Sequence, residues 1–137
     1  MSDIHDAHRI TTDPDPFEPF RISLGFRVGD VLHLSGQAAI DERGEIVGAG
    51  DFDAQAEQTF RNLRRVLGLG GSSMEQIVKV TIYLTDMGNF PKILELRERH
   101  FTPPYPADTI VEVSALGLPE LMIEIEAIAL VDGRVVG

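Results

Sequence analysis

Apolar and polar residues alternate with the period of a β-strand along much of the chain, starting at residue 21. Five stretches show this alternation: residues 21–28, 31–37, 77–84, 108–113 and 121–130. The turn-forming pair Gly29-Asp30 separates the first two stretches, so we expect a hairpin there. A second turn is expected around Arg43-Gly44, before the next element begins.

Two further segments have helical spacing. The first runs from about Ala54 to Leu67, with an apolar stripe that includes Phe60 and Leu63, and Asp51 or Asp53 can cap it. The second opens at Asn89-Phe90-Pro91, with a capping side chain and a proline in its first turn, and ends near Phe101. The order β-β-(β)-α-β-α-β-β predicts an α+β fold with both helices on one face of a sheet.

The length of 137 residues suits one domain. Residues 1–19 are polar and punctuated by prolines, so we predict an N-terminal arm there and a single domain over residues 20–137. The first residues form no apolar stretch, so we expect no secretory signal, no transmembrane segment and a cytoplasmic location.

The net charge of -10 repels phosphate and anionic lipids, so neither nucleic acid nor membrane is expected as a partner. The chain has no cysteine, which excludes disulfides, thiol nucleophiles and cysteine-ligated metals.

Side chains alternate across a strand, so each predicted strand has two faces. The apolar face under the helices is expected to include Ile123, Ile125, Ala127 and Ala129 from the last strand and Val78, Val80, Ile82 and Leu84 from the middle one. The opposite face is mixed and carries Met122, Glu124, Glu126, Ile128, Lys79, Thr81 and Tyr83. This mixture favours a partly buried surface, such as a subunit contact with polar pockets, over a solvated sheet face.

Glu124 and Glu126 lie on one strand face, about 7 Å apart, which is within the range of an acid/base pair. Solvation, or a salt bridge to Lys79, is the ordinary alternative. Ser35 and His33 are also about 7 Å apart, too far for a nucleophilic pair in most rotamers. Ser35, with the flexible Gly36 behind it, can still contact a small ligand.

Histidines offer little evidence for a metal site. His5 and His8 have a spacing that serves a metal on a helix, but no third or fourth ligand is evident, so we predict none. His100, Arg97 and Arg99 lie in the last turn of the second predicted helix, where positive charge complements the helix dipole. A structural role is therefore expected for these three residues.

Four segments of the chain are informative when taken together: LSGQAAIDERGEIVG at 34–48, VKVTIYLTDMGNF at 78–90, PPYPADTIVEV at 103–113 and IEIEAIAL at 123–130. In this order and spacing they resemble the Rid family, also called YjgF-like, whose best-known members are enamine/imine deaminases. The resemblance covers about residues 20 to 131. It implies a chorismate-mutase-like α+β fold with a mixed sheet, assembled as a homotrimer with the sheets turned inward and small-molecule sites between subunits. It also implies that water adds to a 2-imino acid or its enamine, ammonia leaves and a 2-keto acid forms, without metal or organic cofactor.

The family's site residues carry over position by position. The serine of SGQ is Ser35, and the glutamate that positions or protonates around the attacking water is Glu124. Phe20 corresponds to an aromatic residue, usually tyrosine, and Leu94 to a position that often holds asparagine. Asp108 stands where an arginine usually follows Pro-Ala and pairs with the substrate carboxylate.

The aspartate after Ala107 changes the expected ligand. An arginine there would form a bidentate contact worth about 1.5 to 3 kcal/mol per hydrogen bond, whereas Asp108 repels a carboxylate. Retained activity on 2-imino acids would need another cation, and the candidates are Arg21, Arg27 and Arg97.

We therefore expect a hydrolase or deaminase that acts on a small imine, enamine or related C–N compound, with an altered substrate preference. The alternative is a non-catalytic trimer that binds a small metabolite or a protein partner. A ribonuclease role, attached to some family members, is disfavoured by the net charge of -10.

Overall fold

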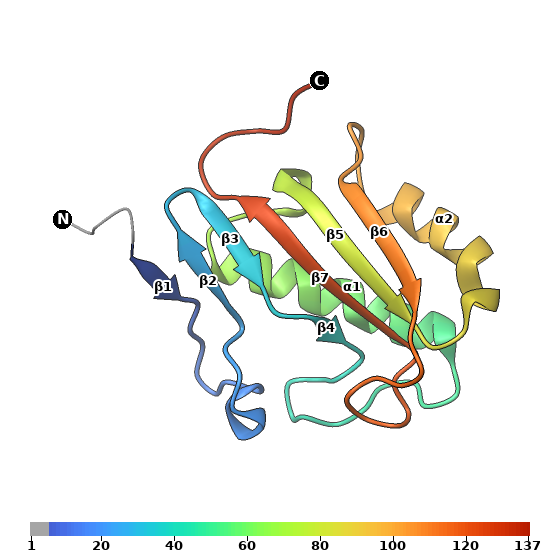
Figure 1. Ribbon diagram of the computed structural model, residues 1–137. Coiled ribbons are helices and arrows are strands. Elements are labelled where there is room, and N and C mark those ends of the chain that lie inside the picture. Colours follow the sequence, from blue (N-terminus) through green and yellow to red (C-terminus); the bar gives the residue numbers. More distant parts are fainter. Residues whose placement is uncertain (1–5) are drawn as a thin grey trace.

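The computed structural model describes residues 6–137 and builds them around one mixed β-sheet (Figure 1). The strands are β1 (Ala7–Arg9), β2 (Gly25–Val28), β3 (Val31–Leu34), β4 (Gln37–Ala38), β5 (Ile77–Leu84), β6 (Ala107–Glu112) and β7 (Ile123–Leu130). Their order is β1-β2-β3-β7-β5-β6, and the short β4 pairs with β7 beyond the end of β3. Neighbouring strands are antiparallel except β5 and β6, which are parallel.

Two α-helices, α1 (Phe52–Leu69) and α2 (Phe90–His100), pack on one face of this sheet (Figure 1). Short 3₁₀ turns are present at η1 (Glu18–Phe20), η2 (Met74–Gln76) and η3 (Met87–Asn89). The apolar stripe of α1, with Phe60 and Leu63, and the buried Ile93 of α2 share one core with the sheet. The predicted α+β fold with both helices on one face is confirmed. No helix among residues 6–137 is long and apolar enough to cross a membrane.

The helix ends follow the capping chemistry only in part. Asp51 caps α1 by accepting a hydrogen bond from the Ala54 amide at 3.1 Å, as predicted, although the helix begins two residues earlier than expected. The prediction that a side chain at Asn89 caps α2 is wrong, because Asn89 closes η3 and makes no capping hydrogen bond. Asp86 instead caps η3 through the Gly88 amide at 2.8 Å.

The first predicted strand is shorter than expected. Residues before Gly25 do not join it, because Pro19 lies in η1 and Arg21 then takes a left-handed conformation with φ 61°. The hairpin at Gly29-Asp30 is confirmed. The division into an arm over residues 1–19 and a domain over residues 20–137 stays a prediction. Within that predicted arm, β1 adds an edge strand to the sheet.

The two faces of the sheet follow the alternation, with one exception. Residues Ile123, Ile125, Ala127 and Ala129 of β7 are buried, as predicted. The prediction that Val78 faces the core is wrong, because an irregularity between Ile77 and Lys79 shifts the register of β5 against β7. Ile77 takes the buried place and Val78 is only half-buried.

Candidate functional site

The side chain of Glu124 contributes to the wall of a small, mainly apolar cavity, which we call the Glu124 cavity. Its volume is about 140 Å³. Phe17 and Phe20 line it from η1 and the residues before it, and Leu118 and Leu121 line it from the loop before β7. The structure therefore brings the predicted Phe20 and Glu124 together, in surroundings that suit an apolar ligand group beside one carboxyl.

Gly36 lets the Glu124 carboxyl lie directly against the backbone. A Cβ atom at position 36 would lie 2.8 Å from Cδ of Glu124, closer than real side chains approach. A larger residue here would displace the Glu124 carboxyl, so glycine serves the close approach rather than a left-handed backbone. Gly36 lines the same cavity, so two of the predicted ligand contacts, Gly36 and Phe20, flank the predicted catalytic residue.

The surroundings of Glu124 favour its protonated form. Burial raises the pKa of Glu124, and the negative charge of Glu126 raises it further. The hydroxyl of Tyr83 donates a hydrogen bond to Glu126, and this bond, with burial, raises the pKa of Tyr83. A carboxyl with a raised pKa can give a proton closer to neutral pH than an ordinary glutamate can, which is what general acid catalysis requires.

Ser35 lies beside Gly36, but its hydroxyl is bound to a backbone carbonyl away from the Glu124 cavity. The Ser35 Oγ donates a hydrogen bond to the Ser23 carbonyl oxygen at 2.5 Å. Ser35 is half-buried and is not among the residues that line the Glu124 cavity. Its predicted contact with a ligand therefore stays a prediction, and its observed contact joins the segment before β2 to the end of β3.

Asp108 lies in a different cavity, between α2 and β6, which we call the α2–β6 cavity. It has a volume of about 550 Å³ and also contains Leu94, Arg97, Phe101 and Tyr105. Both oxygens of Asp108 bind Arg97, with Oδ1 3.0 Å from Nη2 and Oδ2 3.0 Å from Nε. Although the residue lies on an exposed edge strand, its side chain is only 18% exposed and that of Arg97 is 23% exposed.

Sequence reasoning missed this ion pair. It assigned Arg97 to the helix dipole or, with Arg21 and Arg27, to a possible contact with a substrate carboxylate, whereas in the structure Arg97 binds Asp108. Arg27 instead forms ion pairs with Asp30 and Asp132, and Arg21 closes η1. The alternation within β6 carried part of the signal, but the pairing of β6 with β5 was needed to place Asp108 on the helix side.

The register of β6 separates Asp108 from its neighbour Ala107. Asp108 pairs with Val80, which is buried under the helices, whereas Ala107 pairs with the exposed Lys79. Paired residues in a sheet point to the same face, so Ala107 lies on the open face and Asp108 on the helix side. Within one chain, the predicted ligand contacts are therefore divided between two cavities, and Ala107 lines neither.

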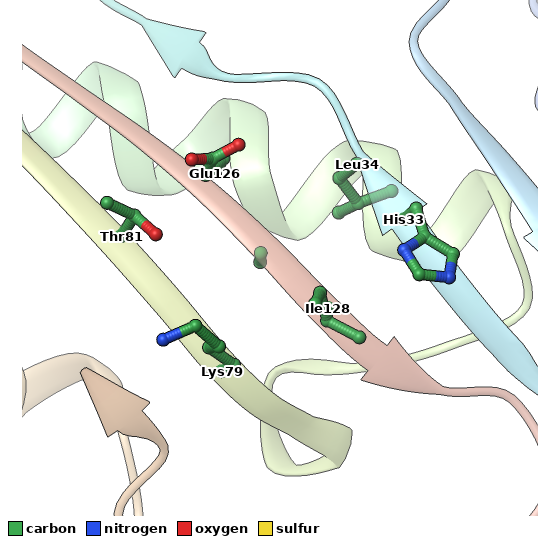
Figure 2. A pocket seen from close by; sticks show the side chains of 7 residues that line it. His33, Leu34, Lys79, Thr81, Glu126 and Ile128 are labelled. Carbon is green, nitrogen blue, oxygen red and sulfur yellow. The ribbon is translucent and has the colours of Figure 1, made fainter. Parts of the chain in front are cut away.

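A third cavity, of about 230 Å³, lies on the open face of the sheet (Figure 2). His33 from β3, Lys79 and Thr81 from β5, and Glu126 and Ile128 from β7 line it. No ion pair joins Lys79 to Glu126 among the described residues, so the salt bridge considered from the sequence is not formed. Glu126 accepts the hydrogen bond of Tyr83 instead, a contact that sequence spacing alone did not reveal.

Metal ligands are not gathered anywhere in residues 6–137: no group of three or more histidines and carboxylates is placed to hold an ion. His8 is exposed on β1, and His5 lies outside the described residues. His100 stacks on Phe60 with ring centroids 4.1 Å apart, and burial lowers its pKa. His100 thus packs against the core in addition to lying in the last turn of α2.

Comparison with known proteins gives consistent matches. The family described as Endoribonuclease L-PSP matches residues 11–131. A RutC family protein of Pyrococcus horikoshii is 40% identical over 117 residues, which are 85% of this chain and 90% of that protein. A 2-iminobutanoate/2-iminopropanoate deaminase of Dermatophagoides farinae is 31% identical over 119 residues, 87% of this chain and 91% of that protein.

The fold has matches among solved structures as well. The crystal structure of RidA from the Antarctic bacterium Psychrobacter sp. superposes with a TM-score of 0.81 at 34% identity, covering 90% of this chain and 98% of the other. These matches extend over nearly the whole sheet and both helices. The chain therefore belongs to the Rid family, also called YjgF-like, to which the name Endoribonuclease L-PSP is also attached.

Proposed function

We propose that the protein is a small-molecule hydrolase or deaminase that acts on an imine, an enamine or a related C–N compound, with a substrate preference altered at Asp108. One observation carries this proposal: Glu124 presents a carboxyl with a raised pKa at the wall of an apolar cavity, held against Gly36. A 2-iminobutanoate/2-iminopropanoate deaminase among the relatives supports the same reaction class.

The chemistry follows from the two protonation states of one carboxyl. Protonated Glu124 can give its proton to the imine nitrogen, which makes the carbon more electrophilic. The resulting carboxylate takes a proton from the attacking water as the water oxygen bonds to the substrate carbon, which gives a carbinolamine and protonated Glu124 again. Glu124 then gives this proton to the amino nitrogen. As the C–N bond breaks, the hydroxyl oxygen forms the C=O bond and returns its proton to Glu124, so the products are a carbonyl compound and ammonia. The net change is one water consumed for each C=N bond, and no cofactor takes part.

The assembly we propose is a chorismate-mutase-like homotrimer with the open sheet faces turned inward. Two half-buried apolar side chains on that face, Met122 and Ile128, support a contact surface, and the polar cavity of Figure 2 would then lie inside the assembly. In such a trimer the Glu124 cavity of one subunit would be completed by the α2–β6 cavity of the next. Sedimentation should give a mass near three chains, and a stable monomer would contradict this arrangement.

The ligand contacts proposed are Ser35, Gly36, Ala107, Asp108, Phe20 and Leu94. Phe20 and Leu94 are 47% and 54% exposed in the single chain, so both are available to a ligand or a neighbouring subunit. Asp108 places a carboxylate where an anionic ligand group would be repelled. The substrate is therefore proposed to carry no carboxylate at that end. We also propose that the protein works in the cytoplasm, and that neither nucleic acid nor membrane is a partner, since the charge of -10 repels both.

A comparison of Glu124→Gln with Glu120→Gln tests the catalytic role. Glu120 is exposed just before β7, so its substitution changes the charge equally and leaves the cavity carboxyl in place. With uncharged imines generated in situ, Glu124→Gln should lower kcat by about 10²-fold or more, the usual contribution of a general acid or base, while Glu120→Gln should not. Equal turnover by the two variants would remove Glu124 from the mechanism.

The second candidate function is a non-catalytic trimer that binds a small metabolite or a protein partner. The hydrogen bond that occupies Ser35 and the internal partner of Asp108 favour it, since both groups are engaged before any ligand arrives. Thermal shift with small amines, amides and keto acids separates the two functions, because a ligand that binds the folded state raises its stability. Stabilisation without turnover of any imine or enamine would support the binding module.

A further inference from the structure

Arg97 presents a guanidinium whose carboxylate site is already filled. Asp108 meets it through two parallel contacts, Nη2 to Oδ1 and Nε to Oδ2, each 3.0 Å long. This two-pronged geometry is the one in which arginine binds a free carboxylate ligand. The side chain of Asp108 comes from β6 and that of Arg97 from α2, so the pair spans the α2–β6 cavity wall instead of belonging to one helix surface.

Arg97 lines the α2–β6 cavity, and Asp108 occupies only its Nη2 and Nε atoms. Its Nη1 atom has no hydrogen-bond partner among the described residues. The Arg97 Cζ lies 5.8 Å from the centroid of the Phe90 ring, within the distance of a cation–π contact. Phe101 and Tyr105 add aromatic surface, and Glu98 brings a second carboxylate to the cavity. The cavity thus holds one cation against two carboxylates, and its balance disfavours any further anion.

We propose that Arg97 is a latent carboxylate-binding site that Asp108 fills from within the chain, so that the α2–β6 cavity selects small uncharged carbonyl compounds over carboxylates. The free Nη1 donates to a neutral carbonyl oxygen, and the aromatic side chains hold the apolar part of the ligand. This inference deepens the proposed function by naming the ligand class, and it rests on that function only for the step after binding. Its test measures binding alone, so it can fail or succeed independently of turnover.

The experiment compares pyruvate with pyruvamide, which differ by the charge of one group. Binding is measured by calorimetry in every protein and, where Arg97 is present, also by NMR titration of the Arg97 Nε–Hε resonance. The wild-type protein should bind pyruvamide and show little response to pyruvate. Asp108→Asn keeps the size of the side chain and removes the internal charge, so pyruvate should then bind at least about tenfold more tightly than to the wild type. The double variant Asp108→Asn/Arg97→Gln should lose this gain.

A matched control separates the local effect from net charge. Asp53→Asn raises the net charge by the same amount and breaks an ion pair to Lys92 of α2, 3.1 Å long and outside the α2–β6 cavity. It should leave pyruvate binding unchanged. An equal gain in Asp53→Asn and Asp108→Asn would overturn the proposal, as would an Asp108→Asn protein that gains nothing. The wild-type preference needs no variant, and a wild type that binds pyruvate as well as pyruvamide would also refute the inference.

Discussion

Gln55 is a buried polar residue that anchors the segment before β7, next to the Glu124 cavity. Its substitution should lower the free energy of unfolding substantially. It lies on α1 with no exposed surface. Its amide nitrogen donates to the carbonyl oxygens of Gly48 and Glu120, at 3.2 and 2.8 Å, and its amide oxygen accepts from the Met122 amide at 2.8 Å. One side chain therefore joins the helix, the loop before it and the chain that enters β7 two residues before Glu124.

The substitution Gln55→Leu keeps a similar volume and removes all three hydrogen bonds. Each backbone group left buried without a partner costs about 1 to 3 kcal/mol, although some of these groups will recover a hydrogen bond to water. We therefore expect the free energy of unfolding to fall by about 3 to 5 kcal/mol. For a domain of this size such a loss corresponds to a decrease in Tm of about 10 to 15 °C.

Urea unfolding at one fixed protein concentration measures this loss, since an assembled protein gains stability with concentration. Gln58→Leu is the matched control, because Gln58 lies on the same helix and, within residues 6–137, its side chain bonds only to the nearby side chains of Asn62 and Arg61. The control should cost about 0.5 kcal/mol or less. A difference below about 1 kcal/mol between the two variants would show that Gln55 does not anchor the segment before β7.

Two further predictions concern the coupled groups on the open sheet face. The pKa of Glu124 is raised in the folded state, above the unfolded value near 4.5. Between these two pKa values the folded protein binds more protons than the unfolded chain. The contribution of Glu124 to the free energy of unfolding therefore falls as pH rises through that window. Glu124→Gln should therefore match the wild type below about pH 4 and exceed its unfolding free energy at neutral pH; equal stability at both would mean that burial does not penalise the charge. Ultraviolet titration should show a phenol that ionises above the usual pKa of 10 and disappears in Tyr83→Phe, and an ordinary pKa for that phenol would contradict the hydrogen bond to Glu126.

Local chemistry determined much of the fold, so the sequence predicted much of it. The alternation in β7, the Asp51 cap and the hairpin at Gly29 each depend on residues close in the chain. The errors arose where a neighbouring element decides the conformation. Asn89 has the right residue type for a cap, but it is the last residue of η3, and its backbone is therefore not in the extended conformation. Val78 follows the alternating pattern, but the register shift in β5 turns it away from the core.

The candidate site could be predicted only as a set of residues. Resemblance and alternation identified Glu124, Gly36 and Phe20, and the structure places all three at one cavity. The raised pKa of Glu124 depends on burial and on Glu126, so it required knowledge of packing. The engagement of Ser35 by the Ser23 carbonyl could not be predicted either, since it joins residues twelve positions apart through the pairing at the start of the sheet.

Asp108 shows how strand pairing changes a functional interpretation. In the sequence, Asp108 follows the proline-rich segment 103–106, at a position that contacts the ligand in related proteins, so Asp108 was expected to contact a ligand. The parallel register of β6 with β5 turns that carboxylate toward α2, where Arg97 meets it within the same chain. The negative charge of Asp108 is therefore already neutralised by Arg97 and does not call for a cationic ligand. The remaining specificity lies with the part of Arg97 that Asp108 leaves free, so the ligand should be sought among uncharged hydrogen-bond acceptors.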